Sequence, residues 1–213
     1  MNRELRVVDD LAEQGAELFL ALRPRTVALA GGATPRRLYE RLAQLDYAWA
    51  ETDVCFGDER CVPPNHPDSN FRMASEALLS HVRARVHHMP GETCDAAGYE
   101  EELAGIFGRD LPRFDLVFLG LGADGHAASL FPGDPALDER ERWVVRVERA
   151  DHARLTMTLP VLSAARTAVF LVSGEAKREA LRLLMAGAGI PAARVAAERV
   201  VVLADSVAAR GVG

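Results

Sequence analysis

The stretch FDLVFLGLGADGHAASLFPG, residues 114–133, decides the fold because an apolar run stops abruptly in a glycine-rich segment. Residues 114–120 are short and apolar, which predicts a buried β-strand. Gly120, Gly122 and Gly125 then break the pattern and predict a tight turn. A buried strand that ends in such a turn is typical of an α/β sheet, where ligands bind beyond the carboxyl ends of the strands.

Helical and strand patterns alternate through the rest of the chain. Strands are expected at residues 26–30, 52–57, 142–148, 167–172 and 199–205, and helices at 9–22, 34–45, 68–82, 95–107 and 175–187. This alternation predicts an α/β fold with a mostly parallel sheet. No repeat, linker or low-complexity tract interrupts it, so we expect one domain over residues 1–213.

The composition limits the classes of partner. A net charge of −6 argues against nucleic acid, although a locally positive cleft could still bind a small anion. No apolar run approaches the roughly 18 residues of a membrane span, so no membrane partner is expected. The first 19 residues lack the apolar core of a signal peptide, and we expect a cytoplasmic protein.

The cysteines show no pairing pattern. Their number is odd, no C-x-x-C pair occurs, and we expect reduced thiols at Cys55, Cys61 and Cys94. His66, His87 and His88 could combine with Cys55 and Cys61 in a metal site. Their spacing matches no familiar template, so no metal is expected.

Four segments follow predicted strands or open predicted helices, and we expect them to converge at one edge of the sheet: 31–36, 57–70, 120–131 and 173–178. In the first, Gly31 and Gly32 would let the backbone approach a ligand, with Thr34 as the N-cap and Pro35 at the first helical position. Free N–H groups there could bind phosphate. Plain capping, which does not need paired glycines, is the alternative.

The second segment combines Asp58, Glu59 and Arg60 with a proline-rich loop. The planar guanidinium of Arg60 could bind a phosphate through two hydrogen bonds. The alternative is that the three charged residues only form a solvated cluster on the surface. In the fourth segment, Lys177 is the only lysine among 25 lysine and arginine residues. A lysine in the first turn of a helix is disfavoured by the helix dipole unless an anion binds there, although its isolation could be chance.

His126 is the candidate general base of the third segment, because a histidine titrates near neutrality and small residues surround it. Asp124 or Asp58 could orient its imidazole or bind substrate hydroxyls, and the amides of residues 122–125 could stabilise an oxyanion. A tight turn with an Asx-type bond from Asp124 is the structural alternative. The fragment GLGADG also matches G-x-G-x-x-G, with Glu148 as a ribose-binding acid, but Pro132 and Pro135 would break the required helix.

Together the four segments resemble the 6-phosphogluconolactonase family. Its GGSTP-like loop, DERxVPxxHxxSN, GxGxDGHTASLFPG and G-x-x-K motifs correspond here to GGATP, DERCVPPNHPDSN, GLGADGHAASLFPG and SGEAK. The resemblance covers roughly residues 26 to 205. Ala33 replaces the usual serine and Ala127 the usual threonine, so any contact made by those hydroxyls must come from backbone amides or water.

The resemblance implies a three-layer α/β/α Rossmann-like sandwich that hydrolyses 6-phospho-D-glucono-1,5-lactone in the pentose phosphate pathway. It implies no metal and no cofactor. It also implies that His126 is the general base and that Arg60 and Lys177 bind the phosphate. Glucosamine-6-phosphate deaminases are similar, but they usually read DEY for this chain's DER, and NEP follows their GHIAF where SLFPG stands here. A non-catalytic sugar-phosphate sensor is the alternative from another class. Monomer and small homo-oligomer both remain open.

Overall fold

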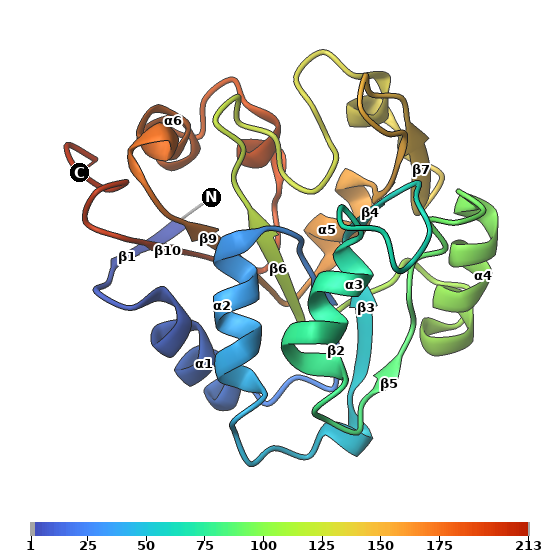
Figure 1. Ribbon diagram of the computed structural model, residues 1–213. Coiled ribbons are helices and arrows are strands. Elements are labelled where there is room, and N and C mark those ends of the chain that lie inside the picture. Colours follow the sequence, from blue (N-terminus) through green and yellow to red (C-terminus); the bar gives the residue numbers. More distant parts are fainter. Residues whose placement is uncertain (1–2, 213) are drawn as a thin grey trace.

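A seven-stranded parallel sheet forms the centre of the protein (Figure 1). The computed structural model describes residues 3–212. Across the sheet the strands are β1 (Arg3–Val7), β10 (Arg199–Ala204), β9 (Thr167–Val172), β6 (Leu116–Gly120), β2 (Thr26–Leu29), β3 (Asp53–Phe56) and β5 (Arg85–Val86). Every neighbouring pair is parallel. The predicted α/β fold is therefore confirmed.

Helices flank this sheet and account for its buried strands. They are α1 (Leu11–Leu22), α2 (Ala33–Leu42), α3 (Asn70–Ala74), α4 (Ala96–Phe107), α5 (Leu159–Ala164) and α6 (Arg178–Ala186). In Figure 1, α1, α2 and α3 lie together on the face turned to the viewer. All six residues of β9 are buried, as expected for a parallel strand covered on both faces. In the described part of the chain, no helix has the length and apolar character needed to cross a bilayer.

A second, antiparallel sheet stands beside the first and was not expected. It consists of β4 (Asp58–Arg60), β8 (Arg154–Met157) and β7 (Val144–Val147), in that order. The strand predicted at 142–148 exists as β7, but it pairs with β8 rather than joining the parallel sheet. Strands β4 and β5 have only three and two residues, too few to produce a hydrophobic period.

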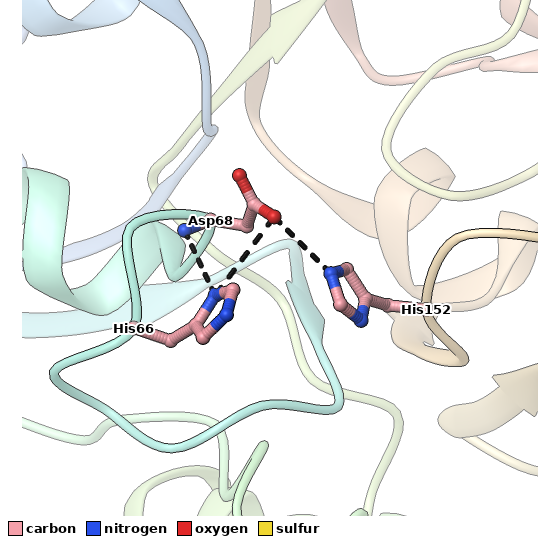
Figure 2. A group of neighbouring side chains, drawn as sticks. All are labelled: His66, Asp68 and His152. Atoms are coloured by element: carbon pink, nitrogen blue, oxygen red, sulfur yellow. Dashed lines mark hydrogen bonds and ion pairs between the residues drawn. The ribbon is translucent and has the colours of Figure 1, made fainter.

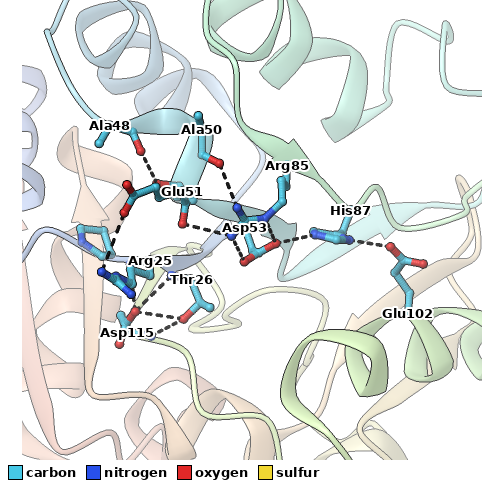
Figure 3. Close-up of polar contacts among 12 residues, drawn as sticks. Arg25, Thr26, Ala48, Ala50, Glu51, Asp53, Arg85, His87, Glu102 and Asp115 are labelled. Atoms are coloured by element: carbon cyan, nitrogen blue, oxygen red, sulfur yellow. Dashed lines mark hydrogen bonds and ion pairs between the residues drawn. The ribbon is translucent and has the colours of Figure 1, made fainter.

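A polar network fixes the amino ends of β3 and β5, the last two strands at one side of the sheet (Figure 3). The Arg85 guanidinium donates hydrogen bonds of 2.7 and 2.8 Å to the two carboxylate oxygens of Asp53. His87 lies between Asp53, at 2.9 Å, and Glu102 of α4, at 2.5 Å. The network thus joins β3, β5 and α4 at the edge of the sheet where strand β3 begins.

A disulfide connects Cys61 to Cys94, with 5.1 Å between the Cα atoms. The expectation of three reduced thiols is therefore wrong for this pair, whereas Cys55 is a buried free thiol. The two cysteines are 33 residues apart, and only the fold brings the end of β4 beside the loop before α4. Sequence spacing holds no signal for such a contact.

Candidate active site

A pocket of about 200 Å³ lies where the chain changes direction across the sheet. Strands β2 and β6 are neighbours, but the chain continues from β2 towards β3 and from β6 towards β9. Their carboxyl ends therefore leave a crevice, the usual ligand position in such folds. All four predicted segments contribute to it, and the predicted residues that line it are Gly31, Gly32, Asp58, Arg60, His126 and Lys177.

His126 and Asp124 form a close pair at this pocket. Asp124 Oδ1 lies 2.5 Å from His126 Nδ1 and also accepts the backbone N–H of His126 at 3.2 Å. A carboxylate that accepts the Nδ1 proton leaves Nε2 of the neutral ring with a free lone pair. Burial raises the pKa of Asp124, but the hydrogen bonds from His126 outweigh it and the pKa falls below its ordinary value.

The turn glycines make room for the imidazole itself. A Cβ on Gly122 would lie 2.1 Å from His126 Nδ1, and a Cβ on Gly125 would lie 2.6 Å from Ile190. The Gly122 N–H donates to the His126 carbonyl and the Gly125 N–H to the Gly122 carbonyl. These two amides are therefore engaged within the turn, which argues against the oxyanion role suggested for them.

No helix follows the G-x-G-x-x-G fragment. Residues 121–134 form turns and an isolated bridge, and the next element is a 3-10 helix at Pro135–Asp138. A dinucleotide site needs a helix whose N-terminus faces the pyrophosphate. The dinucleotide alternative therefore does not fit this fold.

Asp58 supports the turn that carries His126 through a hydrogen bond with Ser129, rather than through a hydrogen bond with the imidazole. Its carboxylate is buried and accepts a 2.7 Å hydrogen bond from Ser129 Oγ, while its carbonyl accepts one of 2.9 Å from Asn70 Nδ2. Asn70 explains why residue 31 is a glycine, because a Cβ on Gly31 would lie 1.9 Å from Asn70 Oδ1. Asn70 and Ser129 were not singled out from the sequence, although both stand within the quoted motifs.

Glu59 fixes the loop between β4 and α3. It is 1% exposed and accepts hydrogen bonds from the N–H groups of Arg60, Asn70 and Phe71 and from Ser69 Oγ, at 2.7 to 3.0 Å. Burial raises the pKa of Glu59 above its ordinary value, despite these four donors. We therefore assign Glu59 to the support of the pocket rather than to its surface, which it does not line.

Three cationic side chains line the pocket. Antiparallel pairing places Arg60 of β4 opposite Arg154 of β8, and Lys177 is the N-cap of α6. Among the described residues, the Nε atoms of both arginines are buried without a hydrogen-bond partner. Such unsatisfied donors are costly unless an acceptor arrives. Arg154 was missed from the sequence because β8 was not predicted.

The first segment differs from its prediction. Gly32, with φ of 107°, is the N-cap of α2, whereas Thr34 lies inside the first turn. The N-cap prediction for Thr34 is therefore wrong, because glycine alone adopts this backbone conformation readily. Thr34 lines a neighbouring hollow of about 290 Å³ together with Asp10 and Arg37. Gly31 and Gly32 remain at the main pocket.

Aromatic and strained residues complete the surroundings of the imidazole. The Phe131 ring lies 4.5 Å from the His126 ring, and the Arg149 guanidinium lies 4.0 Å from the Phe131 centroid. Ala128, which lines the pocket, has φ of 49°, an unfavourable conformation for a residue with a side chain. The turn that carries His126 is thus held from several sides.

Comparison with known proteins agrees with this geometry. Residues 4–203 match the family profile described as glucosamine-6-phosphate isomerases/6-phosphogluconolactonase. The chain belongs to this family. A Synechocystis 6-phosphogluconolactonase is 44% identical over 186 residues, which cover 83% of this chain and 74% of the relative.

Solved structures share the fold over its full length. The 6-phosphogluconolactonase from Leishmania guyanensis has a TM-score of 0.88, is 27% identical, and the match covers 100% of both chains. A monomeric glucosamine-6-phosphate deaminase has a TM-score of 0.85 over 99% of each chain, but only 20% identity. That second likeness shows the fold alone.

Proposed function

We propose that this protein hydrolyses 6-phospho-D-glucono-1,5-lactone to 6-phospho-D-gluconate, a step of the pentose phosphate pathway. The observation that carries the proposal is the Asp124–His126 pair at a pocket lined by Arg60, Arg154 and Lys177. The 44% identity to a protein named 6-phosphogluconolactonase supports the same reaction.

The proposed mechanism needs one base and one water molecule. His126 Nε2 takes a proton from water as the oxygen forms a bond to the lactone carbonyl carbon, and Asp124 stabilises the imidazolium. The tetrahedral intermediate then expels the ring oxygen, which receives the proton from His126. Atoms and charge balance without a covalent enzyme intermediate, a redox partner or a cofactor.

The cationic side chains would bind the anionic groups. Arg60 and Lys177 are assigned to the phosphate, and the unpaired Nε of Arg154 offers a further donor beside Arg60. Gly31 and Gly32 would contribute N–H groups at the start of α2, where the dipole favours an anion. Thr34 has no role in this proposal, because it lines the neighbouring hollow.

The direct test is acid release from freshly generated 6-phosphogluconolactone, corrected for spontaneous hydrolysis. The wild type should accelerate the release, and His126→Ala should lose a factor of about 10²–10⁴ in kcat, the usual contribution of a general base. Binding of 6-phosphogluconate should persist in the variant. Binding without acceleration by the wild type would favour a sensor, and ammonia release from glucosamine 6-phosphate would favour a deaminase.

A further inference from the structure

We propose that His66, Asp68 and His152 form a zinc site outside the pocket. One potential ligand atom from each of these side chains lies within 4.8 Å of the other two (Figure 2). Two imidazoles and a carboxylate are a common donor set for Zn²⁺. None of the three residues lines the pocket that contains His126.

All three ligand atoms lie within 4.8 Å of one another, and the two distances to Asp68 are close to those around a tetrahedral ion. Asp68 Oδ2 lies 3.1 Å from His152 Nε2 and 3.8 Å from His66 Nδ1. Zinc bonds of about 2.0–2.1 Å at tetrahedral angles place neighbouring ligand atoms about 3.3–3.4 Å apart. Changes of about half an ångström would therefore bring both pairs to the required spacing, within the freedom of partly exposed side chains.

His66 offers Nδ1 as a ligand atom. The backbone N–H of Asp68 donates to His66 Nδ1 at 3.2 Å, so this nitrogen carries a lone pair that can act as a ligand. Metal binding through Nδ1 would replace this hydrogen bond. The three side chains are 30–55% exposed, so that an ion can enter and water can complete its coordination.

The ion would join two loops that are distant in sequence. His66 and Asp68 lie between β4 and α3, whereas His152 lies between β7 and β8. Pairing of β4 with β8 brings these loops together, and the Asp68 carbonyl accepts a 2.6 Å hydrogen bond from Arg60. A bound zinc would therefore restrain the loop whose Asp68 carbonyl accepts the hydrogen bond from Arg60.

The metal grouping considered from the sequence differs from this one. His88 packs against the Phe71 ring, His87 is held by Asp53 and Glu102, and Cys61 is in the disulfide. Only His66 of that grouping belongs to the observed cluster. His152 is 84 residues from Asp68, a separation that no sequence template covers.

The experiment is calorimetric titration of the oxidised full chain with Zn²⁺, supported by the visible absorption of bound Co²⁺. We expect one equivalent of zinc to bind, and His152→Ala and His66→Ala each to lose at least tenfold in affinity. His88→Ala is the matched control, because His88 also pairs with a carboxylate, Glu92, but lies outside the cluster. It should bind zinc like the wild type.

A thermal scan gives a second readout that does not depend on lactonase activity. Free zinc about a hundredfold above its Kd should raise the Tm by about 5–10 °C in the wild type, and much less in His152→Ala. Circular dichroism checks that each variant is folded. The proposal is overturned if no saturable binding occurs up to about 100 µM zinc, if His152→Ala binds equally well, or if His126→Ala abolishes binding.

Discussion

Glycine is required at position 122 because the imidazole of His126 fills the space that a side chain would occupy. A Cβ at this position would lie 2.1 Å from Nδ1, which is far below any van der Waals contact. From the sequence, the small residues around His126 suggested room for a ligand to approach its ring. The sequence did not reveal that Gly122 makes room for the ring itself, because that depends on how the turn folds back.

Gly122→Ala should therefore displace the imidazole and lower kcat by about 10²-fold, with the fold retained. Gly105→Ala is the control, because a Cβ at this position in the last turn of α4 meets nothing within 4 Å and should stabilise the helix by up to about 0.5–1 kcal/mol. The measurement is the corrected rate of acid release together with urea unfolding. Wild-type kcat in Gly122→Ala would contradict the packing argument.

Lys177→Ala should raise KM for the phosphorylated lactone about 10-fold or more, because a charge-assisted hydrogen bond contributes about 1.5–3 kcal/mol. KM for unphosphorylated gluconolactone should change little. Arg182→Ala removes a cation from the same helix, where Arg182 pairs with Glu179 away from the pocket, and serves as control. An equal loss with both lactones would refute the phosphate assignment.

At the scale of elements, the Asp53–Arg85 ion pair ties β3 to β5. The hydrogen bond from Arg85 lowers the pKa of Asp53 below its ordinary value of 3.8, against the opposing effect of burial. A lowered carboxyl pKa stabilises the folded state above the unfolded pKa, and this stabilisation disappears as the pH falls through the folded value. The ion pair should therefore matter at neutral pH and fade below about pH 3.8.

Asp53→Asn should lower the free energy of unfolding by roughly 1 kcal/mol at pH 7, a modest value because Arg85 is half exposed. The difference from wild type should shrink steadily as the pH falls below about 3.8 and through the lowered pKa of Asp53. Urea unfolding across this range is the measurement. Glu51→Gln, which breaks an exposed 3.8 Å pair with Arg25, should have no measurable effect at any pH.

Element prediction succeeded where an apolar pattern was long enough to show a period. The strand at 167–172 and the helix beginning near residue 96 were found nearly to the residue. Strands β4 and β8 were missed, and with them the antiparallel sheet, although β2, β3 and β7, also of four residues, were found. Arg154 was missed for the same reason, because only the pairing of β4 with β8 places it opposite Arg60.

For the whole molecule, the Cys61–Cys94 bond closes a loop of 33 residues around α3 and β5. Restricting the unfolded chain in this way contributes about 3–4 kcal/mol in the chain-entropy account. Reduction should lower the free energy of unfolding by up to that amount. In a reducing cytosol the bond would be open.

Urea unfolding with and without a phosphine reductant measures this contribution. Alkylation of the denatured chain should label one thiol, that of Cys55, before reduction and all three afterwards. The free energy of unfolding of the double variant Cys61→Ser/Cys94→Ser should not change when the reductant is added. Three labelled thiols without reduction would contradict the disulfide.

The second sheet has a consequence for how such proteins diverge. His126 and Asp124 follow β6 of the parallel sheet, whereas Arg60 and Arg154 stand on the small antiparallel one. In the proposed function, proton transfer and most of the anion binding therefore depend on residues from separate parts of the fold. Substitutions of Arg60 or Arg154 on the small sheet can therefore change which anionic lactone is bound while His126 and Asp124 stay in place. Substitutions of Asp58 on the same sheet would also disturb the turn that carries His126, because Asp58 accepts the hydrogen bond from Ser129.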